Sequence, residues 1–306
     1  MTSLKNKTNK TLIVILGPTA VGKTSFAIEL AKYFNTEIIS ADSRQFYREM
    51  KIGTAAPTKQ ELNSVKHHFI GNLSVTDYYN VSKFENEVLD KLKEIFISKN
   101  YAIMVGGSGL YIDAVCKGID ELPDPDKKLR NELKKKYKNH GLESLQQQLK
   151  KLDPEYYTIV DFSNPNRLMR AIEVCLITGK TFTSLRNNIP KNREFEIIKI
   201  GLNRNREKLF NIINSRVDKM INTGLIDEVK SLTKYRNFNS LNTVGYKEIF
   251  EYLDKKITLK QAIENIKTNT RKYAKRQLTW FKKDESIKWF HPDELQKIIE
   301  FTDNYF

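Results

Sequence analysis

The segment GPTAVGKT at residues 17–24 constrains the fold of this chain more than any other feature. It matches the pattern G-x-x-x-x-G-K-[ST], whose glycines let the backbone wrap a phosphate with its amide N–H groups pointing inward. The apolar run TLIVIL at residues 11–16 predicts a buried strand before it, and residues 24–33 have helical spacing after it. A phosphate-binding loop requires a strand and a helix in these places, so we predict such a loop here.

Two side chains of the loop have distinct expected roles. Lys23 supplies a positive charge to the terminal phosphates, and Thr24 offers its hydroxyl to Mg²⁺. Thr24 is therefore the predicted metal ligand, and Mg²⁺ is the predicted cofactor. The residues expected to bind a diphosphate or a nucleotide are Gly17, Pro18, Thr19, Ala20, Val21, Gly22, Lys23 and Thr24.

Short apolar runs alternate with helical segments through the first part of the chain. Residues 37–40 and 101–105 predict two further buried strands, and residues 81–99 predict an amphipathic helix between them. This alternation is typical of a parallel sheet with helices on both faces. We therefore expect an α/β fold with a P-loop NTPase-like core.

The pattern changes in the middle of the chain. Strand signals vanish and helical spacing dominates until a strand returns at residues 196–202. The rest is mostly helical, at residues 206–233, 246–253 and 259–283. We expect a core domain with C-terminal helices and an inserted all-helical domain, formed respectively by residues 1–117 with 193–306 and by residues 118–192.

The ends of two predicted strands carry polar groups. Nucleotide-hydrolysing P-loop proteins place an acid at the end of a neighbouring strand to hold Mg²⁺. Residues 102–112 contain no acid, and Ser108 lies where that acid would be expected. This disfavours a P-loop protein that hydrolyses nucleotides. Asp42 follows the strand at residues 37–40. We expect it to face the same crevice as Lys23, as a general base, a Mg²⁺ partner or simply a turn residue.

The charge is strongly basic. Lysine and arginine number 52 against 37 acidic residues, a net charge of +15. Such an excess favours a nucleic-acid partner, although a generally lysine-rich proteome would also produce it. If residues 259–283 form a helix, six cations fall within an arc of roughly 140° and predict a face that docks RNA phosphates. These cations are Arg271, Lys272, Lys275, Arg276, Lys282 and Lys283.

Several classes of protein are disfavoured. No apolar run approaches the roughly 20 residues that span a bilayer, and residues 11–16 are too short for the core of a signal peptide. The two cysteines, Cys116 and Cys175, fit neither a metal motif nor a disulfide framework. We expect a cytoplasmic monomer with no membrane partner.

Residues 41–57, ADSRQFYREMKIGTAAP, resemble the D-S-x-Q-x-Y-x-x-M-x-I-G-T-A-K-P segment of bacterial tRNA dimethylallyltransferases, also called tRNA isopentenyltransferases. Other blocks similar to that family occur in the family's order along nearly the whole chain: GPTAVGKT, VGGSGLY, NRLMRAIEV, VGYKEI and AKRQLTWF. Two positions depart from the family. Ser108 replaces a threonine but keeps the hydroxyl, and Ala56 stands where lysine is frequent.

The resemblance implies an activity. The family transfers a dimethylallyl group from dimethylallyl diphosphate to N6 of adenosine 37 in tRNA and releases diphosphate. The implied catalytic residues are Asp42, Ser108 and Arg130, with Arg130 supplied by the inserted domain. Asp42 would take the proton of the weakly nucleophilic amine. Donors in the phosphate loop, Mg²⁺ and Ser108 would stabilise the leaving diphosphate.

The same resemblance implies contacts with the anticodon stem-loop, from which the target adenosine must be extruded. The residues implied are Asp42, Ser43, Arg44, Gln45, Asn166, Arg167, Leu168, Met169, Arg170, Val244, Gly245, Tyr246, Lys247, Lys275, Arg276, Gln277 and Trp280.

Two other functions fit part of the sequence. A P-loop kinase for nucleosides or small molecules would use the phosphate loop and Asp42, but it needs neither the basic helix nor the long C-terminal region. A non-enzymatic P-loop protein that binds nucleic acid would leave Asp42 and Ser108 without a role. Without the resemblance, the residues indicate Mg²⁺-dependent group transfer onto nucleic acid.

Overall fold

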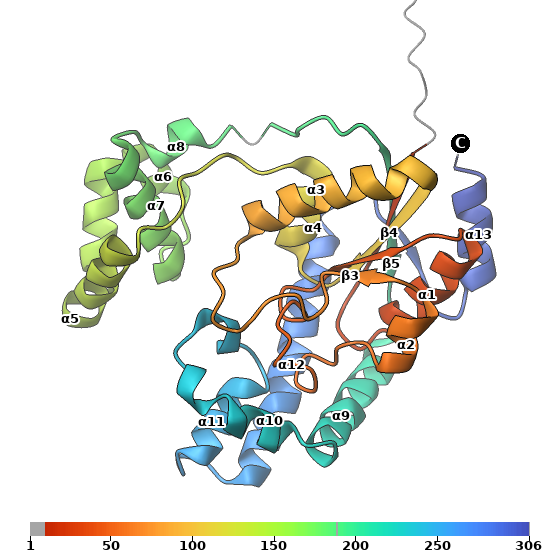
Figure 1. The fold of residues 1–306 in the computed structure, drawn as a ribbon. Coiled ribbons are helices and arrows are strands. Elements are labelled where there is room, and N and C mark those ends of the chain that lie inside the picture. Colours follow the sequence, from red (N-terminus) through yellow and green to blue (C-terminus); the bar gives the residue numbers. More distant parts are fainter. Residues whose placement is uncertain (1–9, 188, 306) are drawn as a thin grey trace, which may run out of the picture. The chain divides into compact units, whose positions relative to one another are not determined.

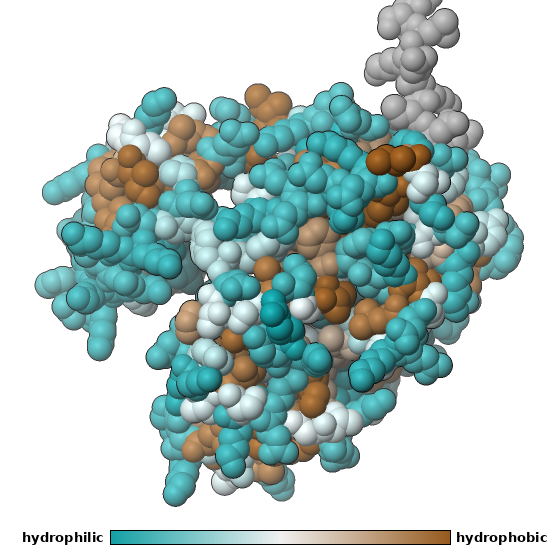
Figure 2. Space-filling view, in the orientation of Figure 1, coloured by the Kyte–Doolittle hydropathy of each residue, from teal (hydrophilic) through white to brown (hydrophobic). Residues whose placement is uncertain are grey.

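The computed structural model describes residues 10–187 and 189–305, which fall into two compact units (Figure 1). The first unit combines the described parts of residues 1–116 and 193–306, and the second is the described part of residues 117–192. Within these residues, every helix is too short or too polar to cross a membrane. Hydrophilic side chains cover most of the face shown in Figure 2, with hydrophobic ones scattered between them.

One parallel sheet forms the centre of the first unit. Its strands lie in the order β3-β2-β4-β1-β5-β6, so the two neighbours of β1 come from distant parts of the sequence. At the end of β1, Leu16 lies opposite Gly106 on one side and Gly201 on the other. In the described part of the chain the strands are β1 (Thr11–Leu16), β2 (Ile38–Ala41), β3 (His67–His68), β4 (Tyr101–Gly106), β5 (Glu196–Leu202) and β6 (Lys288–Phe290).

Helices cover both faces of this sheet. As far as the first unit is described, they are α1 (Lys23–Tyr33), α2 (Lys59–Ser64), α3 (Val81–Ser98), α4 (Gly109–Lys117), α9 (Arg206–Asn222), α10 (Leu225–Ser231), α11 (Tyr246–Leu253), α12 (Leu259–Phe281) and α13 (Leu295–Asp303). Alternate residues of β1 point to opposite faces. Ile13 and Ile15 pack with α1, α9 and α13, whereas Leu12 and Val14 pack with α3 and α4.

The long helix α12 takes part in three separate cores. Ala274 belongs to the core on one face of the sheet and Phe281 to the core on the other face. Ile266 belongs to a third core, in which α9, α10, α11 and α12 pack together. Packing therefore holds this helix along most of its length, which makes it a rigid support for the side chains that it carries.

The second unit is helical and has a core of its own. Its helices are α5 (Lys127–Leu152), α6 (Pro154–Ile159), α7 (Pro165–Thr178) and α8 (Phe182–Leu185). Leu145 and Leu149 of α5 are fully buried there together with Leu168 of α7. The helix α5 breaks at Gly141, whose φ of 70° lies in the left-handed region that favours glycine.

The prediction of a parallel sheet flanked by helices is confirmed. The strands expected at residues 11–16 and 196–202 have these bounds in the structure. Strands β3 and β6 were not predicted, because two or three residues are too few to show a period. Residues 206–233 are mostly helical as expected, and Gly224, with a φ of 102°, separates α9 from α10 within them.

Candidate active site

The predicted phosphate-binding loop connects β1 to the start of α1. Gly17, Ala20 and Gly22 have φ values of 147°, 66° and 108°, and a Cβ atom at Gly17 would lie 2.4 Å from the carbonyl oxygen of Leu202 in β5. Only glycine fits at that position. The Lys23 ammonium donates hydrogen bonds of 2.7 and 3.0 Å to two carbonyl oxygens of the loop. Its charge therefore lies within the curve of the loop.

Two half-buried cations lie beside the loop. Burial lowers the pKa of Lys23 to about 7, the charge of Arg216 adds to this shift, and Asp42 opposes it. Burial also lowers the pKa of Arg216, again against the attraction of Asp42. The buried Nε atom of Arg216 has no hydrogen-bond partner among the described residues. Two such cations beside a single carboxylate favour the binding of an anion.

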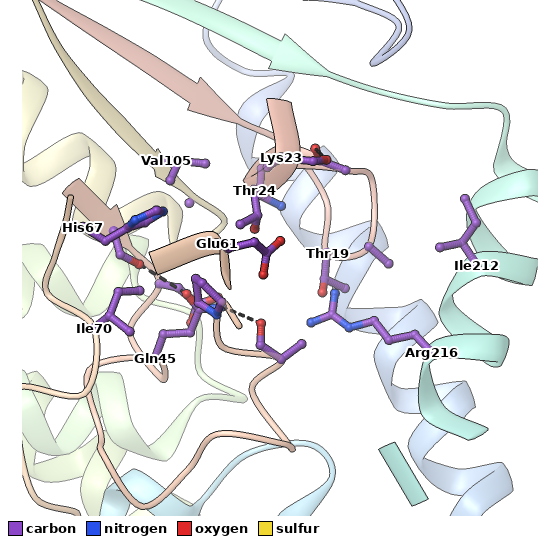
Figure 3. A pocket seen from close by; sticks show the side chains of 18 residues that line it. Thr19, Lys23, Thr24, Gln45, Glu61, His67, Ile70, Val105, Ile212 and Arg216 are labelled. Atoms are coloured by element: carbon purple, nitrogen blue, oxygen red, sulfur yellow. Dashed lines mark hydrogen bonds between the residues drawn. The ribbon is translucent and has the colours of Figure 1, made fainter. Parts of the chain in front are cut away.

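The contribution of Arg216 was not predicted. Figure 3 shows its side chain reaching from α9 towards Thr19 in the phosphate loop. In the sequence, Arg216 is one polar residue on an amphipathic helix, a position that normally faces solvent. Only the packing of α9 beside the loop gives Arg216 its place, so no local signal distinguishes it.

Two cavities adjoin at the loop. The first, which we call the loop cavity, measures about 300 Å³ and is lined by Lys23 and Thr24 among others. The second, the helix cavity, measures about 530 Å³ and is lined largely by residues of α9, α12 and the turn before α11. Both linings include Thr19, Ala20, Asp42 and Arg216.

Asp42 thus lies on the wall that the two cavities share, and on the same cavity as Lys23. It directly follows β2, whose last residue pairs with Gly106 of β4. Its Oδ1 accepts the N–H of Arg44 at 3.0 Å, which holds the carboxylate in the turn. A carboxylate at the boundary of two cavities can exchange a proton with a group bound in either one.

Ser108 contacts Ser43 and is not among the described residues that line either cavity. Its Oγ accepts the N–H of Ser43 at 3.0 Å and lies 3.2 Å from the hydroxyl of Ser43. Tyr273 of α12 lies nearby, and burial raises the pKa of its hydroxyl to about 12, with the charge of Asp42 adding to the shift. Ser108 therefore fixes the turn after Asp42. A direct contact with diphosphate stays a prediction.

A carboxylate on α10 holds the segment that follows this turn. Glu228 accepts the backbone N–H groups of Lys51, Ile52 and Gly53 at 2.7–2.9 Å and the hydroxyl of Tyr246 at 2.7 Å. A Cβ atom at Gly53 would lie 2.5 Å from the ring of Tyr246, so glycine is required. The role of Glu228 depends on a segment some 175 residues away and was not predicted.

The same segment supports Gln45. The Gln45 side-chain amide donates to the carbonyl oxygens of Thr54 and Ala55 at 3.3 and 3.2 Å. Its Oε1 lies 3.4 Å from the hydroxyl of Ser40 at the end of β2. Gln45 lines the loop cavity, where Figure 3 shows it on the side away from Arg216.

The predicted basic face of α12 is present in part. Lys272, Lys275, Arg276, Lys282 and Lys283 are exposed. Arg271 is half-buried, and its guanidinium donates to other side chains of the first unit. The side of α12 away from these cations is buried and includes Gln277, which is 6% exposed.

Comparisons with known proteins show the family of the chain. The model of the IPP transferase family matches residues 45–284. The tRNA dimethylallyltransferase 1 of Bacteroides fragilis is 52% identical over 294 residues, covering 96% of this chain and 98% of that protein. The tRNA dimethylallyltransferase of Christiangramia forsetii is 52% identical over 288 residues, covering 94% and 95%. The chain belongs to the IPP transferase family.

Solved structures of similar fold support this membership. The full-length tRNA isopentenylpyrophosphate transferase of Bacillus halodurans is 36% identical, with a TM-score of 0.71 and 96% of each chain covered. A eukaryotic dimethylallyltransferase, described as acting on tRNA, is 27% identical with a TM-score of 0.81, covering 97% of this chain and 79% of that one. The family resemblance and the P-loop NTPase-like fold expected from the sequence are thereby confirmed.

The residues that the family resemblance assigned to RNA binding differ in their exposure to solvent. Asn166, Arg167 and Lys247 are exposed, and Val244, Gly245 and Lys247 line the helix cavity. Ser43, Arg44 and Arg276 line that cavity as well. Trp280 is 41% exposed, and its indole N–H donates to Asp113 at 2.8 Å.

Three of the residues assigned to RNA binding have buried side chains, so their contact with RNA stays a prediction. Leu168 and Met169 are 0% and 3% exposed in the core of the second unit, and Tyr246 is fully buried in the third core of the first unit. A run of four or five helical residues covers more than one turn, so some of its members must face inward. These three residues support the surface that their neighbours present.

The arginine expected to act from the inserted domain lies in the second unit. Arg130 and Arg170 both form ion pairs with Glu173, which is fully buried. The Arg130 Nε–Oε1 distance is 3.1 Å, and Arg170 also donates to the carbonyl oxygen of Pro123 at 2.6 Å. Glu173 therefore orients both guanidinium groups. A catalytic role for Arg130 stays a prediction.

Proposed function

We propose that this protein transfers a dimethylallyl group from dimethylallyl diphosphate to N6 of adenosine 37 in tRNA, with release of diphosphate. One observation carries the proposal: Asp42 and Arg216 lie on the wall shared by two cavities, one beside the phosphate loop and one beside the basic helix α12. Relatives named tRNA dimethylallyltransferase, about half identical over nearly the whole chain, support this reaction.

The loop cavity suits the prenyl donor. The phosphate loop, Lys23 and Arg216 provide positive charge for a diphosphate. Figure 3 shows Ile70 and Val105 on the side of the cavity away from Arg216, where apolar surface can accept a hydrocarbon chain. One cavity thus offers matching surfaces for both parts of dimethylallyl diphosphate.

The reaction exchanges one bond for another. The bond between C1 of the dimethylallyl group and the bridging oxygen breaks, and a bond between C1 and N6 of adenosine forms. Negative charge develops on the departing diphosphate, where Lys23 and Arg216 stabilise it. The carboxylate of Asp42 takes the proton that N6 loses.

Magnesium fits this arrangement as a metal bound mainly through the substrate. In the described residues, no cluster of three or more histidine, cysteine, aspartate or glutamate side chains could hold a metal. Thr24 and Asp42 line the loop cavity together and offer a hydroxyl and a carboxylate. Mg²⁺ often binds to one or two protein oxygens plus phosphate oxygens and water. It would supply charge neutralisation at the diphosphate.

The helix cavity and α12 suit the RNA. Lys272, Lys275 and Arg276 are exposed cations on one rigid helix, as the phosphate backbone of an anticodon stem-loop requires. The cavity beside them, about 530 Å³, can accept an extruded adenosine. Both cavities are lined by one chain, so a monomer suffices, and tRNA as substrate implies a cytoplasmic enzyme.

A kinase remains the alternative that the phosphate loop alone would suggest. A kinase has no use for the RNA-docking face of α12, and the family of the chain argues against it. Incubation with Mg²⁺, labelled dimethylallyl diphosphate and an anticodon stem-loop carrying A36-A37 decides between the two. We expect label in the RNA. An absence of label, or transfer of phosphate from ATP to a nucleoside, would overturn the proposal.

Asp42→Asn tests the proposed base. Asparagine can still accept the N–H of Arg44, so the turn is retained, but it cannot take a proton. We expect the rate of transfer to fall about 10²–10⁴-fold while the affinity for RNA stays the same. Asp227→Asn, an exposed residue of α10, is the matched control and should transfer normally. Loss of RNA binding in Asp42→Asn would instead make Asp42 a recognition residue.

A further inference from the structure

Gln277 is a buried amide on the helix that carries the RNA-docking cations. It is 6% exposed, whereas Lys275 and Arg276, immediately before it, are exposed. Ala274 and Phe281 flank it along the buried side of α12. A buried amide is costly unless its polar atoms are bonded, so the partners of Gln277 indicate its role.

Both polar atoms of Gln277 bond to backbone groups of the active site. Its Oε1 accepts the N–H of Thr19 in the phosphate loop at 2.8 Å. Its Nε2 donates to the carbonyl oxygen of Gly107, which follows β4, at 2.9 Å. A Cβ atom at position 107 would lie 2.2 Å from Nε2, so this approach depends on glycine. The side chain thus bridges two segments that are distant in sequence.

These two segments shape the diphosphate site. Thr19 lines both cavities and precedes Ala20, which has a left-handed backbone. The backbone N–H of Thr19 donates to the side chain of Gln277, so this amide group of the phosphate loop is hydrogen-bonded to α12. Gly107 precedes Ser108, whose hydroxyl fixes the turn that follows Asp42. Gln277 therefore sets the spacing between the phosphate loop and the turn behind the proposed base.

We infer that Gln277 is a positioning residue for the diphosphate loop, and that it does not contact RNA as the family resemblance implied. The inference rests on the proposed function for the identity of the donor. Because α12 packs in three cores, the part of its backbone that carries Gln277 is held in place. One helix consequently presents cations to RNA on one side and holds the donor loop on the other.

Gln277→Met tests the inference, because methionine has a similar length but cannot form these hydrogen bonds. We expect the KM for dimethylallyl diphosphate, and the Kd for inorganic pyrophosphate with Mg²⁺, to rise about tenfold or more. The KM for the anticodon stem-loop should stay within about twofold of that of the unmodified protein. If Gln277 had only a structural role, Gln277→Met would raise the KM for both substrates together and lower the thermal unfolding temperature.

Lys275→Gln is the matched variant on the same helix, two residues away. It should give the opposite pattern, with a raised KM for the stem-loop and an unchanged Kd for pyrophosphate. The inference is overturned if Gln277→Met keeps the pyrophosphate affinity of the unmodified protein, or if its defect is confined to RNA. Failure of the unmodified protein to transfer the prenyl group would count against the proposed function alone, because pyrophosphate binding needs no transfer.

Gln277→Glu keeps the inference testable if the methionine variant does not fold. A neutral carboxylic acid can accept from Thr19 and donate to Gly107, as the amide does, whereas a carboxylate cannot donate. The ratio of its pyrophosphate affinity to that of the unmodified protein should therefore recover as the pH falls through the pKa of the new carboxyl group. A ratio that does not change with pH would overturn the inference.

Discussion

Binding of a diphosphate should add a proton to Lys23. In the free protein the pKa of this lysine is about 7, because burial and the charge of Arg216 disfavour the ammonium. A diphosphate beside it favours the charged form and raises the pKa towards the ordinary value of 10.5. A proton is then taken up at any pH above about 7 and below the pKa of the complex.

The size of this uptake follows from the pKa. With a pKa of about 7, roughly one tenth of the Lys23 side chains carry a proton at pH 8 and roughly nine tenths at pH 6. Each bound diphosphate should therefore take up about 0.9 proton at pH 8, about 0.5 at pH 7 and about 0.1 at pH 6. By linkage, the affinity should weaken by up to about tenfold per pH unit above pH 7.

Calorimetric titration measures the uptake directly. Pyrophosphate is titrated at saturating Mg²⁺ in two buffers of different ionisation enthalpy, and the difference in heat gives the number of protons. Lys23→Arg is the matched control, because a guanidinium stays charged across this range and leaves only the proton changes of the ligand. An uptake that is equal at pH 6 and pH 8 after this subtraction would refute the reasoning.

The same pKa has a consequence for folding, and other side chains yield further tests. The unfolded chain binds the Lys23 proton up to a pH of about 10.5, so the free protein should gain stability as the pH rises from about 7, which thermal unfolding can follow. Arg216→Gln should raise the KM for the prenyl donor more than the KM for RNA in steady-state assays, and equal changes would contradict its place beside the loop. Glu228→Ala should lower the free energy of unfolding by about 3 kcal/mol in urea titrations, because three N–H groups lose their acceptor, whereas Asp227→Ala should not. Lys282→Gln should reduce the slope of log K for RNA against log salt by about 0.7–0.9, and an unchanged slope would place RNA phosphates elsewhere.

Local sequence signals were sufficient for the elements that have a strong pattern. TLIVIL forms β1 because six apolar or β-branched residues can be buried on both sides of a parallel strand. The loop GPTAVGKT and the buried side of α12 follow equally from spacing. The reaction itself came from the family resemblance, since phosphate binding and basic charge fit several kinds of group transfer.

The parts that escaped prediction depend on contacts between distant segments. Arg216 and Glu228 are ordinary polar residues of amphipathic helices until packing places them beside the phosphate loop and residues 51–53. The helical period also explains why a single motif contains both buried and exposed residues, because it directs Leu168 and Met169 inward while Arg167 remains exposed. A motif taken as a continuous run of letters does not distinguish these directions.

The position of β5 in the sheet determines when this protein can acquire its sites during synthesis. Strand β1 pairs with β4 and with β5, and the whole second unit is translated between these two partners. That unit is contiguous and has its own core, so it can complete its packing while β1 is paired with β4 alone and still lacks β5. Gly17 rests against Leu202 of β5, and Arg216 and Gln277 arrive still later. A nascent chain therefore has no finished diphosphate site until α12 has left the ribosome.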